Sequence, residues 1–297
     1  MAEQLKTYRG SCHCGTYIYE AKVSDDAKPH ECNCSMCYRK NILWFAPKNE
    51  NIHFVKGDPK TMTNYTFGRK TWDHKFCPNC GVQLLVIGYV EPPQPGEEKE
   101  PMTGVNVRSF QPGQGIDVRK METTPMDGKS WGAPYEPTKY TGPEPKAVIE
   151  GGKLYTGSCH CGAVTVALKS KPLDKTFTET VTECNCSICS RLGTVWLYPL
   201  KEQVEIQGED NLKIYLFGSK LLGKSFCKTC GTMIHNQLQP VTEEQISKMP
   251  EAQATFIKGA MPLQPINLRV FNDLNVKDMD VGLFDGYNIV QPRYVEP

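Results

Sequence analysis

The sequence lacks any marked excess of charge of one sign. Its 34 lysines and arginines face 33 aspartates and glutamates, which leaves a formal net charge of +1. A nucleic-acid surface needs a basic excess, so we expect no nucleic-acid partner. The sequence also lacks an apolar run near the ~20 residues of a membrane-spanning helix, so we expect no membrane partner.

The first ten residues, MAEQLKTYRG, contain no apolar core of the kind that marks a secretory signal. Proteins of the cytoplasm and nucleus keep their thiols reduced, whereas secreted proteins form disulfides. We therefore expect a cytoplasmic location, with the nucleus as the alternative.

Cysteine is the residue in excess. The 297 residues include 14 cysteines, seven in each half. An odd number cannot pair completely within one half, and cysteines two positions apart on an extended chain have poor geometry for a disulfide. The spacing therefore favours metal binding by reduced thiols over disulfide formation.

The two halves of the chain are copies of each other. The segment Gly10–Gly15 (GSCHCG) recurs at Gly157–Gly162, and each copy later carries F-C-x-x-C-G, N-x-R and Asp-Gly. The offset stays at about 150 residues, which is the size of a domain, so the pattern indicates a tandem duplication. We expect a first domain over residues 6–128, a proline-rich, semi-rigid linker over 129–152 and a second domain over 153–290.

Short runs rich in valine, isoleucine, tyrosine and phenylalanine predict two small all-β domains. In the first copy the expected strands are Tyr17–Ala21, Leu43–Ala46, Ile52–Lys56, Thr63–Phe67, Lys75–Cys77, Gln83–Tyr89 and Val105–Phe110. In the second copy they are Ala163–Leu168, Val195–Tyr198, Val204–Gln207, Lys213–Phe217, Ser225–Cys227, Thr232–Leu238 and Ile266–Phe271. The segment Thr242–Gln245 resembles a capping box and predicts a short helix that stops near Pro250.

Four cysteines of each copy have the spacing of a closed, structural zinc site. A C-x-C pair and a C-x-x-C-G turn can together supply four thiolates in tetrahedral arrangement. Zinc binding of this kind is coupled to folding. The expected ligands are Cys12, Cys14, Cys77 and Cys80 in the first copy, and Cys159, Cys161, Cys227 and Cys230 in the second.

The other three cysteines of each copy form a C-x-C-x-x-C triad. The triads are Cys32, Cys34 and Cys37, and Cys184, Cys186 and Cys189. Three protein ligands and an open position are typical of a catalytic zinc. A zinc with three thiolates has a net charge near −1, which suits binding of a sulfur ligand better than activation of water. The alternative is a site closed by a histidine, or a different sharing of the seven thiols.

In this order the motifs G-x-C-x-C-G, C-x-C-x-x-C, F-C-x-x-C-G and N-x-R resemble the glutathione-dependent formaldehyde-activating enzyme family, also called the centromere protein V family. The resemblance covers nearly the whole of both copies. It implies two tandem Mss4-like domains with four zinc ions per chain, structural at the four-cysteine sets and active-site at the triads. It also implies carbon–sulfur lyase chemistry on adducts between an aldehyde and a thiol such as glutathione.

Two arginines follow the triads and are the expected catalytic residues. Arg39 and Arg191 can offset the negative charge of a triad or hold a substrate carboxylate, and a surface salt bridge is the alternative role. Arg108 and Arg269, in the N-x-R motif, are candidates for the same work.

The copies differ beside the triads. Asn41 stands where the second copy has Gly193, and His74 stands where it has Lys224. We therefore expect the two sites to differ in substrate or rate, with the second copy the more typical of the family. Two other functions fit the sequence: a zinc-stabilised module that binds protein or chromatin without catalysis, and a different small-molecule enzyme built on the same pocket.

Overall fold

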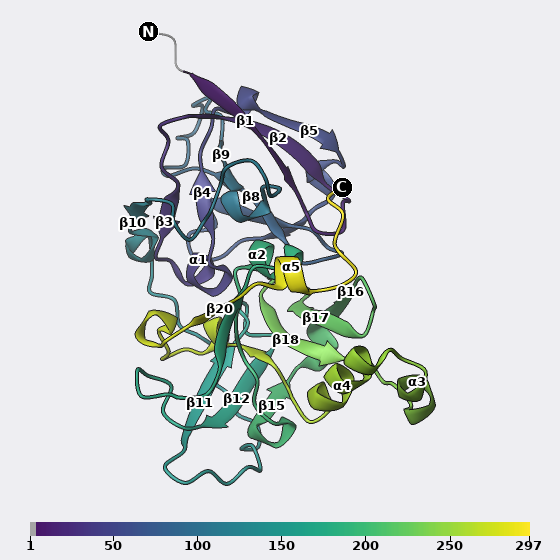
Figure 1. The fold of residues 1–297 in the computed structure, drawn as a ribbon. Helices are drawn as coiled ribbons and strands as arrows, with labels where there is room; N and C mark the ends of the chain where they lie inside the picture. Colours follow the sequence, from purple (N-terminus) through teal and green to yellow (C-terminus); the bar gives the residue numbers. More distant parts are fainter. Residues whose placement is uncertain (1–3) are drawn as a thin grey trace.

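The computed structural model describes residues 4–297, which form a mostly β structure with a few short helices. Each copy builds one three-stranded and one seven-stranded sheet, and the two copies stack end to end (Figure 1). The expectation of two tandem, mostly β units is therefore confirmed. The exact limits 6–128 and 153–290 stay a prediction.

The first copy begins with the small sheet. Its order is β1-β2-β5, with the bounds β1 (Leu5–Ser11), β2 (Ile18–Ser24) and β5 (Ile52–Lys56). The large sheet has the order β10-β3-β4-β9-β8-β7-β6. Its strands are β3 (His30–Cys32), β4 (Leu43–Phe45), β6 (Thr63–Tyr65), β7 (Trp72–Phe76), β8 (Gln83–Gly88), β9 (Met102–Asn106) and β10 (Thr124–Met126).

The second copy repeats this plan. Its small sheet is β11-β12-β15, with β11 (Lys153–Ser158), β12 (Thr165–Ser170) and β15 (Val204–Gln207). Its large sheet has the order β16-β17-β18-β19-β14-β13-β20. The strands are β13 (Val181–Cys184), β14 (Val195–Leu197), β16 (Leu212–Leu216), β17 (Leu222–Cys227), β18 (Met233–Leu238), β19 (Ile266–Asn267) and β20 (Gly282–Phe284). In both copies the last strand pairs in parallel with the strand that leads into the triad.

The helices are short. They are α1 (Ser35–Lys40), α2 (Ser187–Leu192), α3 (Glu243–Ser247), α4 (Glu251–Ala260) and α5 (Gly286–Ile289). Single 3-10 turns are η1 (Asn49–Asn51), η2 (Pro59–Thr61), η3 (Val107–Ser109), η4 (Gly128–Ser130), η5 (Lys201–Gln203), η6 (Glu209–Asn211), η7 (Leu268–Val270) and η8 (Val276–Asp278). Among the described residues, none of these helices has the length and apolar character needed to cross a membrane.

Several sequence expectations need correction. The strand expected over Val105–Phe110 ends at Asn106, because the Asn106 side chain accepts a hydrogen bond from the Arg108 amide (3.1 Å) and turns the chain into η3. The same occurs at Asn267, which starts η7. The capping box at Thr242 is present and starts α3, as predicted. The triad helices α1 and α2 were not expected.

The two copies meet through an aromatic contact between their C-x-x-C-G turns. Phe76 and Phe226 lie edge to face, with ring centroids 6.5 Å apart. A Cβ atom at Gly81 would lie 2.8 Å from the Phe226 ring, and one at Gly231 would lie 2.9 Å from Phe76. Both glycines also have positive φ, so this turn requires glycine for its backbone as well as for the approach of the other copy.

Candidate metal centres at the junction of the two copies

The two four-cysteine sets are each gathered into one cluster by the fold. All four sulfurs of each set lie within 4.8 Å of one another. Measured pairs include Cys12–Cys14 at 3.6 Å and Cys14–Cys77 at 3.5 Å. A tetrahedral zinc with bonds of about 2.3 Å to sulfur needs sulfurs about 3.8 Å apart, so these clusters fit zinc.

The two triads are gathered in the same way, but with three sulfurs each. Cys32, Cys34 and Cys37 form one cluster, and their counterparts in the second copy form the other. Over residues 4–297, no histidine or carboxylate oxygen joins either cluster within 4.8 Å. The donor set therefore fits a zinc ion that keeps one coordination position open.

The N-terminus of a short helix positions the cysteines of each triad. Cys34 is the N-cap of α1, and its sulfur accepts the amide hydrogen of Cys37 (3.4 Å), the third residue of the helix. The Trp44 indole donates to the Cys37 sulfur (3.3 Å), and Trp196 donates to Cys189 (3.4 Å). Hydrogen bonds to a thiolate stabilise its charged form, so the two tryptophans favour the form of the cysteine that binds a metal. Sequence analysis missed them, although a tryptophan follows the third cysteine by seven residues in both copies.

The repeated Asp-Gly motif closes over each triad. A Cβ atom at Gly128 would lie only 2.4 Å from the Cys32 sulfur, and one at Gly286 would lie 2.5 Å from Cys184. Asn33, between the first two cysteines, donates to Asp127 (2.7 Å) and accepts from the Lys129 amide (2.8 Å). The triad asparagine thus fixes the Asp-Gly loop in place through its side-chain amide.

The second copy makes the same loop contacts. Asn185 donates to Asp285 (2.8 Å) and accepts from the Tyr287 amide (2.8 Å). Because the motif recurs with its partners, the Asp-Gly loop belongs to the triad site in both copies.

The pKa of one thiol in each triad is lowered by its neighbours. Hydrogen bonding to Cys34, followed by Cys37, lowers the pKa of Cys32 to about 3. In the second triad, hydrogen bonding to Cys184 and Cys186 lowers the pKa of Cys189, and the Lys224 charge adds to this. The thiolate is the form of cysteine that binds a metal.

The surroundings of the two triads differ at one strand position. Lys224 donates to the Cys189 sulfur (3.4 Å) and to Asn236 (2.7 Å), and its ammonium lies 4.6 Å from the Trp196 ring centre. In the first copy the matching residue is His74, whose ring lies 6.4 Å from the Trp44 ring. Burial, followed by the charge of Lys40, lowers the pKa of His74 to about 3, so this histidine is neutral. Its Nδ1 atom is buried without a protein partner.

The apolar character of the first site strengthens this contrast. Trp44 and Val86 pack with Ile42 around Cys37. Val86 pairs with His74 across β7 and β8, where the second copy places Asn236 opposite Lys224. At this pair of strand positions the first copy therefore has a neutral histidine and a valine, and the second has an ammonium and an amide.

The expected catalytic arginines lie at the junction of the copies. Arg39 donates to the Ser158 carbonyl (3.4 Å) and to Asn272 (3.0 Å), both in the other copy. Arg191 likewise donates to the Ser11 carbonyl (3.3 Å). Both side chains are buried. These bonds account for the arginines as contacts between copies, and a catalytic role stays a prediction.

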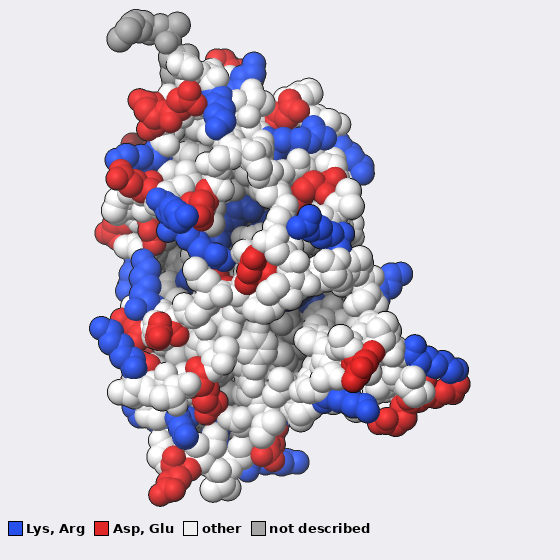
Figure 2. Space-filling model, in the orientation of Figure 1, with Lys and Arg blue, Asp and Glu red and all other residues white. Residues whose placement is uncertain are grey.

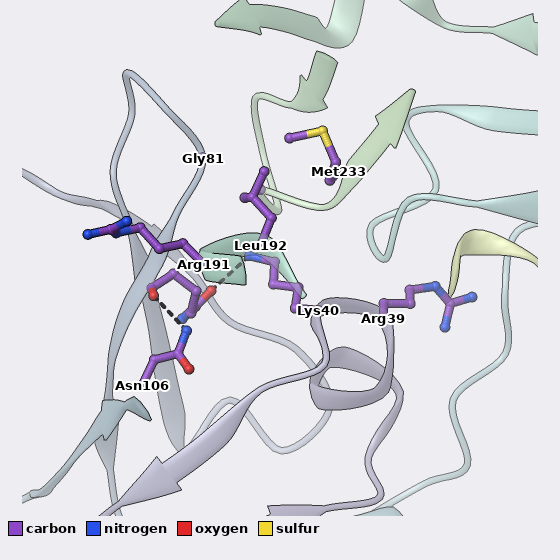
Figure 3. Close-up of a pocket in the computed structure, with 9 residues that line it drawn as sticks. Arg39, Lys40, Gly81, Asn106, Arg191, Leu192 and Met233 are labelled. Atoms are coloured by element: carbon purple, nitrogen blue, oxygen red, sulfur yellow. Dashed lines mark hydrogen bonds between the residues drawn. The ribbon is translucent and has the colours of Figure 1, made fainter. Parts of the chain in front are cut away.

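Figure 3 shows how residues of both copies line one small cavity at this junction, with Arg39 and Arg191 directed away from each other. Lys40 lies between them and donates to Gln83 (2.8 Å). The cavity has room for about one water molecule, so it is not a substrate pocket.

The difference between Asn41 and Gly193 also has its origin at the junction. Both residues end their helix in the left-handed conformation, with φ of 49° and 61°. A Cβ atom at Gly193 would lie 2.6 Å from the Cβ of Asn41, so the residue that ends α2 must be a glycine. Asparagine is the residue best suited after glycine to this conformation. The contact between the copies thus requires glycine at position 193, and Asn41 adopts the same left-handed conformation in the first copy.

A model of the family described as "Glutathione-dependent formaldehyde-activating enzyme" matches residues 7–110 and 154–256, which together are more than half of the chain. The chain belongs to this family. Membership indicates a glutathione-dependent activity related to aldehydes, and it agrees with the two tandem Mss4-like units seen here. Among solved structures, the chain is similar to a Rhodobacter sphaeroides protein of structural-genomics origin, at 25% identity over 41% of this chain and 93% of that one, with a TM-score of 0.31.

Proposed function

We propose that the protein is a carbon–sulfur lyase that acts on adducts between a thiol, of the glutathione type, and an aldehyde. The observation that carries this proposal is the shape of the triads: three cysteine sulfurs lie within 4.8 Å of one another, and no fourth ligand joins them among the described residues. Family membership supports the class of substrate.

The proposal assigns four zinc ions to each chain. The four-cysteine sets would hold two structural ions, and the triads would hold two active-site ions. A zinc ion held by three thiolates would supply an open position for the thiolate that forms when the carbon–sulfur bond of the adduct breaks.

The proposed reaction breaks or forms one carbon–sulfur bond. In the direction of cleavage, the bond of the hemithioacetal breaks, the electron pair stays on sulfur, the hydroxyl carbon becomes a carbonyl and the hydroxyl proton leaves to a base. Addition is the reverse, so the same groups serve both directions. The indole donors of Trp44 and Trp196 hold the third sulfur of each triad in place while this occurs.

Lys224 contacts a sulfur of the second triad, and His74 lies near Trp44, the tryptophan that donates to a sulfur of the first triad. His74 is neutral with a free Nδ1, so it can exchange a hydrogen bond with the hydroxyl of the adduct. Lys224 instead places a positive charge 3.4 Å from the Cys189 sulfur, where it offsets part of the negative charge of the triad. We therefore propose that the two sites accept different adducts, the first the more apolar ones.

The charged surface supports a small-molecule ligand over a nucleic acid. On the face drawn in Figure 2, lysine and arginine are interspersed with aspartate and glutamate. A cytoplasmic location, as expected from the sequence, completes the proposal, because cysteines must stay reduced to bind the metal.

The test is turnover by the full chain with a panel of adducts formed from glutathione or other thiols and small aldehydes. Replacing Cys32, Cys34 and Cys37 by serine should abolish the first activity and leave a folded protein, whereas Cys77→Ser should unfold the first copy. Lack of turnover of every adduct by the zinc-loaded protein would contradict the lyase and favour a binding module.

A further inference from the structure

The N-terminus of each triad helix is held by the other copy of the domain. Ser35, the first residue of α1, hydrogen-bonds through its hydroxyl to Nε2 of His160 (2.8 Å). The Nδ1 atom of the same histidine hydrogen-bonds to the Tyr65 hydroxyl (2.9 Å). His160 lies between Cys159 and Cys161, so a residue of the second structural cluster reaches into the first triad.

The reverse contact is also made. Ser187, the first residue of α2, hydrogen-bonds to Nε2 of His13 (3.0 Å), and Nδ1 of His13 hydrogen-bonds to Tyr215 (2.8 Å). A contact that recurs with the two partners exchanged is the signature of a twofold interface. Neither histidine has a hydrogen-bonding nitrogen left for a metal of its own copy.

The C-terminal ends of the same helices are held across the junction as well. Arg269 donates to the Tyr38 carbonyl of α1 (3.2 Å), and Arg108 donates to the Ser190 carbonyl of α2 (3.4 Å). These arginines complement the partial negative charge at a helix end. Each helix therefore has a partner from the other copy at both ends, and Figure 1 shows α1 and α2 at the level where the two halves meet.

The segment that follows each copy completes the arrangement. Tyr135 stacks on His160 with centroids 4.4 Å apart and donates to its carbonyl (2.7 Å). Tyr294 stacks on His13 (4.1 Å) and donates to its carbonyl in the same way. Each histidine is thus fixed on its ring face and at both nitrogens. It can therefore orient the serine at the N-terminus of the helix in the other copy.

This support matters because the helices cannot hold their own shape. A helix of six residues is far below the length that is stable alone in water. The third ligand of each triad lies in this helix, so the direction of its sulfur depends on what fixes the helix. In the described structure the other copy contacts both ends of the helix and adds to the contacts made within the same copy.

We infer that His160 is a positioning residue for the triad of the first copy, and that His13 is a positioning residue for the triad of the second copy. Each triad is then completed in trans, and the duplication supplies within one chain what a single domain lacks. The inference rests on the proposed metal function of the triads and adds to it.

The test uses two parent proteins, each with one triad replaced by serines, so that a single triad remains to bind metal. In the parent that retains Cys32, Cys34 and Cys37, we expect His160→Phe to weaken zinc binding at the triad about 10–100-fold, as loss of an outer partner typically does. His13→Phe should leave it unchanged. In the other parent the two variants should exchange their effects. Zinc affinity is measured by competition with a chromogenic chelator.

Phenylalanine keeps the ring that stacks on the tyrosine and removes both hydrogen bonds, so it separates positioning from packing. His160→Gln, whose amide can reach Ser35, should restore part of the affinity. Ser35→Ala removes the same bond without touching the structural cluster and should weaken the first triad in the same way. An equal effect on both triads, an effect on the triad of the same copy, or no effect would overturn the inference.

A second readout does not depend on metal at the triads. Amide hydrogen exchange of the full chain should speed up in α1, and not in α2, when His160 is replaced by phenylalanine. If the parents bind no zinc at their triads, the proposed function fails, and exchange still decides the inference. Exchange in α1 that stays at the wild-type rate would refute the positioning role.

Discussion

Replacing Gly128 by alanine gives a direct test of how the Asp-Gly loop shapes the first triad. The added Cβ atom would lie 2.4 Å from the Cys32 sulfur and 3.3 Å from the Cys34 Cβ. Gly128 is not among the residues of positive φ, so alanine meets no backbone penalty there. The effect of the substitution should therefore be steric and confined to the triad.

The magnitude follows from the overlap. Non-bonded heavy atoms rest at about 3.5–4.0 Å, so the loop or the sulfur must move by more than about 1 Å. Forced overpacking typically costs about 1–3 kcal/mol. If this strain acts on the metal-bound arrangement, zinc binding at the first triad weakens by about 5–150-fold.

The assay is chelator competition on the full chain, with the second triad replaced by serines so that the first alone contributes. Gly259→Ala is the matched control, because a Cβ atom there meets nothing within 4 Å. Gly286→Ala, with its Cβ 2.5 Å from Cys184, should affect only the second triad. Zinc affinity of Gly128→Ala equal to that of Gly259→Ala would refute the account of the loop.

Three further substitutions test the surroundings of the triads. Trp44→Phe removes the indole donor to Cys37 and should weaken zinc binding at the first triad about 10–100-fold, measured by the same competition. Lys224→Met removes the ammonium beside Cys189 and should weaken the second triad, while an affinity equal to wild type would show that the charge is not used. His74→Leu should leave zinc affinity of the first triad unchanged and raise KM for its adduct, and an unchanged KM would remove this histidine from the substrate site.

The sequence was most informative where chemistry is local. Three cysteines within six residues define a triad without knowledge of the fold, and the duplicated C-x-C and C-x-x-C pairs left each triad without a fourth cysteine. The capping box at Thr242 was readable for the same reason, because its partner is three residues away. Strand bounds in the copies were approximate because β pairing depends on distant neighbours.

Contacts between the copies could not be read in this way. Arg39 and Ser158 are 119 residues apart, and His160 and Ser35 are 125 apart, so no local pattern predicts their meeting. The arginine was interpreted from its place after the triad, whereas its partners lie in the other copy. His160 lies between two expected zinc ligands, and nothing in the local sequence indicates that its ring reaches Ser35 in the other copy.

The short helices were missed for a related reason. Six residues are too few to show a helical periodicity in the sequence. Helices this short are stabilised by tertiary contacts rather than by intrinsic helix propensity. The difference between Asn41 and Gly193 was visible in the sequence but was interpreted as a difference between active sites. The close approach of the two helix ends explains why position 193 requires glycine.

The central claim is that each triad is a separate, open metal site in a chain held together by its four-cysteine clusters. The most direct test is the zinc content of the purified wild-type protein and of the variant with both triads replaced by serine, measured together with circular dichroism. The account predicts four zinc ions per wild-type chain and two per variant chain, with the same β-rich spectrum. Two ions in the wild type, or loss of the fold with the triads, would contradict it.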